Sequence, residues 1–532
     1  MANYSSPGVY IVEENAFPNS AVAVETAIPA FIGYTFKAER AGKSLIRIPT
    51  KINSFAEYIE SFGGAFKPSF LVQKKDSAGS SDHITNLKSV QEFKLGTQDY
   101  TLCYEEDHEL YFYNSIRLFY ANGGSSCVIL SIGTYGDPGD NSGKTQGIKV
   151  SDRDFKPSDE LPESPFDLLK NEPLPTLIVI PDIIVLGKAA YDIYQQVLIH
   201  CSAMQSCFVV FDLRNHSANE NPDAVLEEFR TSIGTNFLNY GAAYYPWLNT
   251  VIVDADELTF ENLPESLSTF LEAELAEIFV NYQNEKTKLE AQLVSFRQDK
   301  KDYDQTKLAI FNLNKTHHLA LKSSSPFYRM LLNQARDLFN KMPACGAMVG
   351  LYTMVDNTRG VWKAPANYSL NSVKTPTVKI SSEAQQCFNI DIYTGKSINV
   401  ILPFEGIGTL VWGARTLDGN SQDWRYINVR RTLIMIEQSI KAALRAYVFE
   451  PNNANTWLTV KSMVNTFLTN LWKQGALAGA NPEQAFDVQI GLGSTMTPTD
   501  ILDGKMLITL KVAIVRPAEF IVVTFQQQLQ QS

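Results

Sequence analysis

The chain has 532 residues with 57 acidic and 46 basic side chains, which gives a formal net charge of −11. Hydrophobic residues make up 45% of the sequence, enough for a packed interior and too many for a disordered chain. The acidic balance argues against a protein built to coat nucleic acid or an anionic membrane. No apolar run approaches the roughly 18–20 residues of a membrane-spanning helix, so we expect a soluble protein of several domains.

The six cysteines are widely scattered, and none forms a C-x-x-C pair. Zinc ribbons and disulfide frameworks are therefore not expected, and synthesis in a reducing compartment fits this pattern. The first residues carry neither a basic segment nor an apolar segment, so no secretory signal is expected.

Two strands are predicted near the N-terminus, over residues 7–14 and 22–34. A turn-rich break at 15–20, which contains Pro18, separates them. A lone terminal strand has no local partner. The first strand must therefore pair with a distant sheet edge or with another chain.

A short helix is predicted over residues 54–62, because Ser54 suits a helix N-cap and Gly63-Gly64 a helix stop. The segment that follows, 67–107, is polar. We interpret it as an excursion over the surface.

Strands and helices alternate through the middle of the chain. A helix is predicted over 109–121 and a buried strand over 127–132, and a strand–helix–strand unit follows over 176–180, 188–204 and 207–211. Such a unit favours a parallel sheet covered by helices. The expected fold class is therefore α/β.

Residues 263–342 are helical and charged, and we interpret them as a helical pair or insertion packed on the core. The adjacent His317 and His318 lie toward the polar end of this segment. A solvated pair is expected there rather than a pair of metal ligands.

The last third of the chain has the clearest pattern. Long amphipathic helices are predicted over 425–447 and 457–474, and a strongly alternating strand over 505–515. Pro517 interrupts the chain before a final strand over 520–525.

The search for catalytic motifs finds no G-x-S-x-G, H-E-x-x-H or P-loop pattern. The best candidates are Asp182 and Asp212, which follow two of the parallel strands, together with His216. Open α/β sheets place ligands at such strand ends. The structural alternative is that each aspartate caps a helix or turn. A soluble α/β hydrolase using these three residues is the second functional hypothesis.

Several motifs, taken in order, point to one family. They are residues 7–14, Phe31-Ile-Gly33, Asn122-Gly-Gly124, Pro181-Asp182, Tyr244-Tyr-Pro-Trp247, Tyr426-Ile-Asn-Val-Arg-Arg431, Phe449-Glu-Pro-Asn452, Trp457, Leu471-Trp472 and Pro517-Ala-Glu-Phe520. With them the chain resembles the contractile tail sheath proteins of phages and phage-tail-like injection particles. The resemblance covers nearly the whole chain and is densest over 345–525.

The resemblance implies a structural protein without enzymatic activity, cofactor or metal. Its copies stack as hexameric rings around an inner tube and contract to drive the tube through a target envelope. The implied partners are further copies of the chain, the inner tube protein, and baseplate and tail-terminator or cap proteins, without nucleic acid or membrane insertion. The implied origin is the bacterial cytoplasm, followed by assembly into a phage tail or a released tail-like particle. The compact size favours a tail-like particle, and a phage virion remains open.

The resemblance also implies exchange of terminal arm strands between copies, each completing a sheet that contains strand 505–515. The residues implied in contacts between chains are the arm strands Val9, Tyr10, Ile11, Val12, Phe520, Ile521, Val522 and Val523, the hinges Pro18 and Pro517, the tube-facing Lys461 and Lys473, and the ion-pair candidates Arg430, Arg431 and Glu450. Ordinary surface pairing is the alternative for the last three.

The implied domain layout divides the chain into arms, core and sheath domain. It comprises an N-terminal arm (1–20), a first part of the core (21–132), a surface loop region (133–172), an α/β core (173–254), a helical insertion (255–343), a C-terminal sheath domain (344–515) and a C-terminal arm (516–532).

Overall fold

The computed structural model describes residues 21–74, 90–95, 97–136, 147–159, 161–215, 222–264, 273–296 and 300–520. The chain divides into two units. The larger is formed by Ala27–Thr358 and Pro365–Ile427, and the smaller by the described residues of Met1–Thr26, Arg359–Ala364 and Asn428–Ser532.

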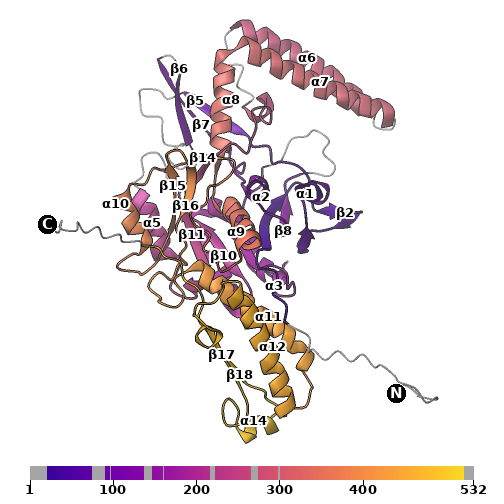
Figure 1. The fold of residues 1–532 in the computed structure, drawn as a ribbon. Coiled ribbons are helices and arrows are strands. Elements are labelled where there is room, and N and C mark those ends of the chain that lie inside the picture. The colour runs from indigo at the N-terminus through magenta and orange to yellow at the C-terminus, as the bar shows by residue number, and fades with distance from the viewer. Residues whose placement is uncertain are drawn as a thin grey trace, which may run out of the picture. The chain divides into compact units, whose positions relative to one another are not determined.

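An eight-stranded sheet forms the centre of the larger unit (Figure 1). In spatial order its strands are β16 (Gly408–Trp412), β15 (Asn399–Phe404), β11 (Gly241–Tyr245), β10 (Phe208–Asp212), β9 (Leu177–Val179), β1 (Pro29–Thr35), β8 (Cys127–Thr134) and β4 (Thr50–Ile52). The pairings from β15 to β8 are parallel, and the two edge strands β16 and β4 are antiparallel to their neighbours. The predicted strand–helix–strand unit is confirmed, because β9 and β10 lie side by side in parallel.

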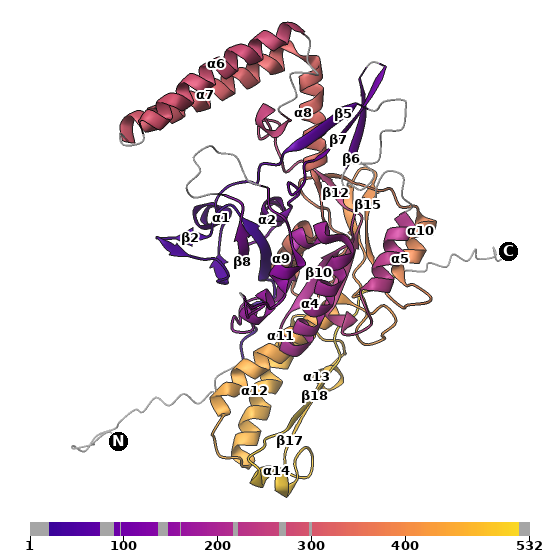
Figure 2. The same ribbon diagram turned by 180° about the vertical axis from the view of Figure 1, so that it is seen from behind.

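Helices cover the large sheet on both faces. Every residue of β1, β10 and β11 is buried, as expected for parallel strands enclosed on two sides. Helix α9 lies in front of the sheet in Figure 1, and α4 lies in front of it in Figure 2. The helices of the larger unit are α1 (Phe55–Phe62), α2 (Phe112–Ala121), α3 (Pro165–Leu169), α4 (Ala190–Met204), α5 (Pro222–Ser232), α6 (Ala273–Ser295), α7 (Lys300–Ser324), α8 (Pro326–Phe339), α9 (Cys345–Arg359) and α10 (Ser382–Asn389).

Small residues let α9 approach α2 closely. A Cβ atom at Gly346 would lie 2.4 Å from the Ser115 carbonyl oxygen, and one at Gly350 would lie 2.5 Å from the Phe119 carbonyl oxygen. Both contacts are with backbone, which cannot move aside as a flexible side chain can. Glycine is therefore required at both positions of α9.

Local signals at helix ends are confirmed where the sequence carried them. Ser54 caps α1, since its hydroxyl accepts a hydrogen bond of 3.2 Å from the Glu57 backbone N–H.

The larger unit also contains two small sheets. One pairs β2 (Glu39–Arg40) with β3 (Lys43–Ser44), and the other has the order β13 (Lys341–Met342), β12 (Leu248–Thr250) and β14 (Val373–Pro376).

The segment 67–107 is not a surface excursion, and that prediction is wrong. It contributes the antiparallel strands β5 (Phe70–Lys74), β6 (Val90–Leu95) and β7 (Gln98–Tyr104), in the order β5-β7-β6. Alternate residues of β5 and β7 are buried with α8 in one hydrophobic cluster. Exposed polar residues, such as Gln73, Lys74 and Asp99, interrupt the apolar pattern of these strands, which explains the wrong prediction.

Helices α6 and α7 run side by side as a hairpin (Figures 1 and 2), and α8 follows. His317 and His318 are both buried here, so the predicted solvated pair is wrong. The His317 ring stacks on Tyr282 with centroids 4.1 Å apart, and His318 Nδ1 lies 2.8 Å from the Tyr328 hydroxyl. The two partners lie on α6 and α8, and a linear pattern does not show such contacts between helices.

The smaller unit pairs two long helices with a short sheet. Its elements are α11 (Ile427–Leu444), α12 (Ala454–Lys473), α13 (Pro482–Ala485), β17 (Phe486–Ile490), α14 (Pro498–Leu502) and β18 (Ile508–Val512). One hydrophobic cluster joins α11, α12 and the two strands. Both predicted amphipathic helices and the alternating strand are confirmed. Helix α11 and strand β18 are shorter than predicted, whereas α12 begins three residues earlier than predicted. None of the helices in the described part of the chain combines the length and apolar character of a membrane span.

Candidate functional site

The strand pair β17–β18 is the first candidate surface for contacts with other chains. The strands are antiparallel, and Phe486, Val488 and Ile490 face Val512, Leu510 and Ile508 in turn. These apolar pairs pack against the cluster that contains α12. The intervening residues, such as Asp487 opposite Lys511, are polar. This alternation fixes which face of the sheet is buried.

The sheet has two strands only within the described residues, so each strand has an outer edge without a strand beside it. The Ala513 N–H donates to the Ala485 carbonyl, which places odd-numbered residues of β18 toward β17. The backbone groups of Ile508, Leu510 and Val512 therefore point to the outer edge. A two-stranded sheet is marginal by itself, and such an edge is a template for a further strand.

The predicted arm strands lie largely outside the described residues. Those not described are Val9, Tyr10, Ile11, Val12, Ile521, Val522 and Val523, together with the hinge Pro18. Phe520 is described and is 74% exposed. Pro517 lies in a stretch without regular secondary structure. The arm and hinge roles stay predictions.

The described segments next to the two predicted arms, residues 21–26 and residue 515, form hydrogen bonds with the same helix, α11. Arg431 Nη2 donates to the Thr26 carbonyl at 2.8 Å, and the Val24 N–H donates to Ser439 Oγ at 3.0 Å. At the other end of the chain, Asn428 Nδ2 donates to the Val515 carbonyl at 3.0 Å. Sequence reasoning missed Asn428 and Ser439, although polar residues within the apolar face of a helix are a signal for such bonds.

The three ion-pair candidates separate into two environments. Arg430 and Arg431 are buried on α11, and Arg431 holds a backbone carbonyl as described above. Burial raises the pKa of Glu437, and the charge of Arg430 opposes that rise. Glu450 is exposed instead. Ion pairs between copies stay a prediction for these residues.

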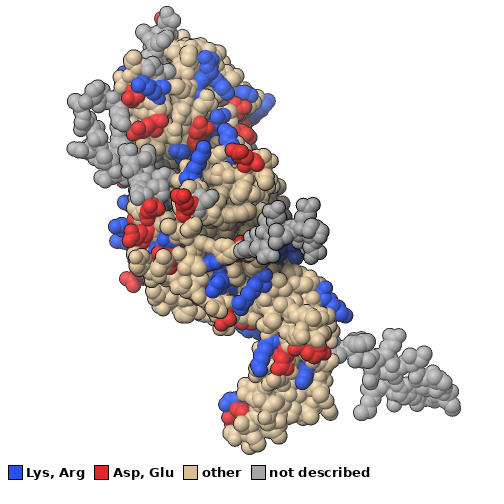
Figure 3. Space-filling view, turned by 60° about the vertical axis from the view of Figure 1, so that its left-hand side comes forward, with Lys and Arg blue, Asp and Glu red and all other residues tan. Residues whose placement is uncertain are grey.

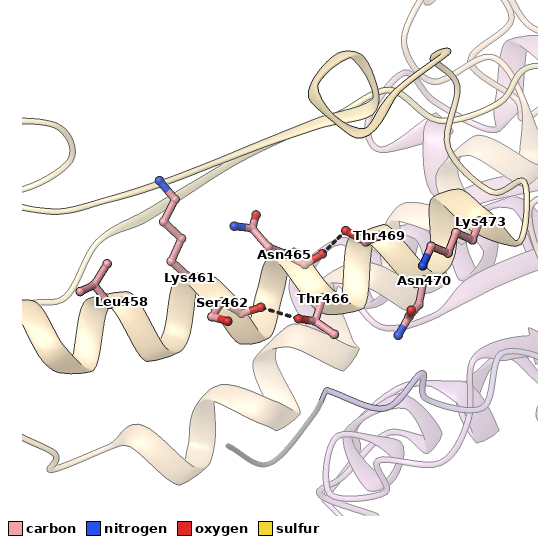
Figure 4. Close-up of a pocket in the computed structure, with 8 residues that line it drawn as sticks. All are labelled: Leu458, Lys461, Ser462, Asn465, Thr466, Thr469, Asn470 and Lys473. Carbon is pink, nitrogen blue, oxygen red and sulfur yellow. Dashed lines mark hydrogen bonds between the residues drawn. The ribbon is translucent and has the colours of Figure 1, made fainter. Parts of the chain in front are cut away.

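One side of α12 forms a shallow groove (Figure 4). Its lining residues are Leu458, Lys461, Ser462, Asn465, Thr466, Thr469, Asn470 and Lys473. The threonine hydroxyls bond within the helix: Thr466 donates to the Ser462 carbonyl at 2.8 Å, and Thr469 donates to the Asn465 carbonyl at 2.7 Å.

The two lysines give this groove a positive charge. No ion pair joins Lys461 or Lys473 to any other described residue. Helix α12 itself contains no aspartate or glutamate. The structure thus brings both predicted tube-facing lysines to one groove that suits an acidic or hydrogen-bonding surface.

The two aspartates of the hydrolase hypothesis act as helix caps. Asp182 Oδ1 accepts hydrogen bonds from the Tyr111 and Phe112 N–H groups at 2.7 and 3.0 Å, at the start of α2. Asp212 Oδ1 accepts from Ala344 and Cys345 at 2.8 and 3.0 Å, at the start of α9.

Burial dominates the electrostatics of both carboxyl groups. It raises the pKa of Asp182 to about 6 and that of Asp212 to about 7, against the opposing effect of their hydrogen bonds. Neither side chain is open to a substrate, since Asp182 is 0% and Asp212 4% exposed. His216 lies outside the described residues. The geometry therefore favours the structural alternative, which is capping of helices distant in sequence.

Two observations bear on metal and nucleic-acid binding, one on the described residues and one on a single face of the molecule. Among the described residues, no three His, Cys, Asp or Glu side chains are grouped to hold a metal ion. Figure 3 shows basic and acidic side chains interspersed over the face in view. Nucleic-acid-binding proteins present a concentrated basic field instead.

A family model described as the phage tail sheath C-terminal domain matches residues 420–528. The tail sheath protein of Vibrio phage KVP40 is 22% identical over 199 residues, and that of Salmonella phage ViI is 27% identical over 144 residues. These segments cover 37% and 26% of this chain. They cover 28% and 22% of the two relatives, so the match spans about a quarter of the length of these proteins.

Solved sheath structures match the chain over its whole length. A sheath complex of the extracellular contractile injection system PVC, in its contracted state, matches with a TM-score of 0.57 and 25% identity, covering 99% of each chain. The contracted helical sheath of the anti-feeding prophage gives a TM-score of 0.54 and 25% identity, covering 99% of this chain and 100% of that one. The resemblance to contractile tail sheath proteins and the mixed α/β fold class are confirmed, whereas strand exchange stays a prediction.

Proposed function

We propose that this chain, whose C-terminal part is a phage tail sheath domain and whose fold is that of contractile sheath proteins, is the structural subunit of a contractile sheath. In this proposal, copies stack as hexameric rings around an inner tube. Contraction of the sheath drives the tube through a target envelope. Its partners are copies of itself, the tube protein, and baseplate and cap proteins.

The observation that carries the proposal is the open strand pair β17–β18. Strands donated by the arms of neighbouring copies would extend this sheet by β-augmentation. Each backbone hydrogen bond gained this way contributes about 0.5–1.5 kcal/mol. A donated strand of several residues would therefore keep two copies joined while the segments that flank the strand change direction. An arm donated in one direction gives a head-to-tail contact, which builds rings or helices.

Exposed apolar side chains in the smaller unit support the proposal independently. Phe449 is 102% exposed, Leu502 88% and Leu458 66%. Phe449 also has a φ of +73°, a left-handed conformation that costs a residue other than glycine roughly 1–2 kcal/mol. A fully exposed, strained phenylalanine brings no benefit to an isolated chain. We assign its ring to a contact with another subunit of the assembly.

The α12 groove is assigned to the inner tube. Lys461 and Lys473 would face acidic groups on the tube, so this contact should weaken as salt rises. Because the motion is a change between packings of copies, it needs no nucleotide and no catalytic residue. The chain is accordingly proposed as a non-enzyme, made in the bacterial cytoplasm, and part of an extracellular injection particle rather than a phage virion.

Deleting residues 1–20 tests the proposal. The shortened chain should keep its fold and unfolding temperature but fail to form sheaths in negative-stain micrographs. Deleting residues 1–6, which precede the predicted arm strand, is the matched control and should leave sheath formation intact. Sheaths of normal length from the longer deletion would refute the proposed exchange of N-terminal arms.

A further inference from the structure

Cys201 and Cys207 lie at the two ends of the turn that joins α4 to β10. Both are buried and neither is in a disulfide, and their Sγ atoms are 3.3 Å apart. A disulfide bond is about 2.05 Å long, so the two sulfurs need to approach by only about 1.3 Å. Side-chain rotation supplies such a shift without displacing the strand. The spacing of the two residues in the sequence gave no sign of this pairing.

The surroundings of the pair activate Cys207. The hydrogen bond with Cys201 lowers the pKa of Cys207 against the effect of burial, and the neighbouring His200 lowers it further. A lowered pKa raises the share of thiolate, which is the reactive form of a cysteine. Burial instead raises the pKa of Cys127 to about 12 and that of Cys103 to about 11.

The turn above the pair lies at the surface. Ala203 and Gln205 are exposed, and Gln205 adopts a left-handed conformation with a φ of +54°. Exposed turns open locally at lower free energy than buried strands. A small oxidant therefore has a short path to Cys207 that leaves the large sheet intact.

We infer that Cys201 and Cys207 form an oxidation site that closes to an intramolecular disulfide when the folded protein meets a peroxide. The Cys207 thiolate attacks one peroxide oxygen, the O–O bond breaks, and the products are a Cys207 sulfenic acid and, after protonation, water or an alcohol. The Cys201 sulfur then attacks Cys207 Sγ, the S–O bond breaks, and water leaves with the Cys201 proton. Two thiols have lost two electrons to the peroxide.

The bond would tie the end of α4 to the start of β10, in the middle of the large sheet. A closed loop restricts the unfolded chain and so favours the folded one. The setting of this event rests on the proposed function: an injection particle made in a reducing cell and released from it meets oxidants outside. The chemistry itself concerns the single chain and does not depend on assembly.

The test uses the purified full-length protein, first reduced and then treated with one equivalent of hydrogen peroxide. After unfolding and alkylation, the reduced protein should carry six labels and the oxidised protein four, because the chain has six cysteines. Peptide mapping should find Cys201 linked to Cys207, and the oxidised protein should unfold a few degrees higher. Six labels after treatment, or a link between other cysteines, would overturn the inference.

Single variants make the result specific. Cys201→Ser should stop disulfide formation and leave a Cys207 sulfenic acid that dimedone traps. Cys387→Ser removes the exposed cysteine and should still form the link, with five labels when reduced and three when oxidised. If Cys201→Ser still loses two labels, the inference is wrong. Failure to form sheaths would leave this result standing, and failure to oxidise would leave the sheath proposal standing.

Discussion

The eight-stranded sheet and the strand pair β17–β18 differ in how completely the chain satisfies them. The sheet of the larger unit has buried, fully paired central strands, and the carboxylate that ends β10 bonds to the start of α9 within the same chain. The strand pair β17–β18 has open edges among the described residues, and its unit exposes Phe449 fully. The difference teaches that the central sheet of the larger unit is satisfied within the chain, whereas the smaller unit leaves sheet edges that the proposed arm exchange would complete.

The largest expected effect comes from removing a donated strand. Deleting residues 520–532 should abolish sheath formation, because the predicted C-terminal arm strand is lost. The unfolding temperature should change by less than about 2 °C, since the proposal places that strand on a neighbouring copy. Calorimetry and negative-stain microscopy measure the two quantities.

Deleting only the polar tail, residues 526–532, is the matched control and should preserve assembly. A large drop in unfolding temperature with the longer deletion would mean that the strand folds back on its own chain. The contrast between a complete and an incomplete sheet would then fail.

Substitution of Asp212 tests whether its hydrogen bonds to the start of α9 stabilise the larger unit. Asp212→Ala should destabilise the fold by about 2–3 kcal/mol, because two buried N–H groups lose their acceptor. Asp212→Asn keeps an acceptor oxygen and should cost much less. Chemical denaturation of the three proteins at pH 6 measures the difference, and equal losses for both variants would contradict the capping role.

The pH dependence of the same residue has a definite sign. Because burial raises the pKa of Asp212 to about 7, above its value in the unfolded chain, the folded state holds a proton that the unfolded state releases. Its stability contribution is complete below about pH 4 and is lost as pH rises through 7, by up to about 4 kcal/mol. Asp212→Asn cannot titrate, so the stability of the variant relative to the natural protein should rise over this range.

The smallest effect on stability is expected at Phe449. Phe449→Gly relieves the left-handed strain but frees the unfolded chain, so the unfolding free energy should stay within about 1 kcal/mol. Assembly should nevertheless weaken, seen as a higher protein concentration at the midpoint of sedimentation. Phe449→Tyr keeps an aromatic ring and should assemble normally. A strong loss of stability with Phe449→Gly would show that the ring serves its own chain.

The comparison also explains which predictions succeeded. Long periodic segments such as α11 and α12, and buried strands such as β10, follow from local hydrophobic patterns, and the sequence predicts them well. The sheet β5-β7-β6 was missed because polar and charged residues, such as Gln73, Lys74 and Asp99, interrupt the apolar pattern of its strands. The burial of His317 was missed because Tyr282, which stacks on it, lies on another helix of the hairpin.

The sequence by itself determined the periodic helices and strands, the α/β class and the resemblance to sheath proteins, since these depend on spacing along the chain. The tertiary structure alone decided what the polar and sulfur groups do. It made Asp182 and Asp212 helix caps and placed Cys201 beside Cys207. It also joined the segments next to both predicted arms to α11 by hydrogen bonds. The physical reason is that hydrogen bonding, desolvation and thiol reactivity depend on neighbours in space, and folding brings those neighbours from distant or non-periodic positions in the chain.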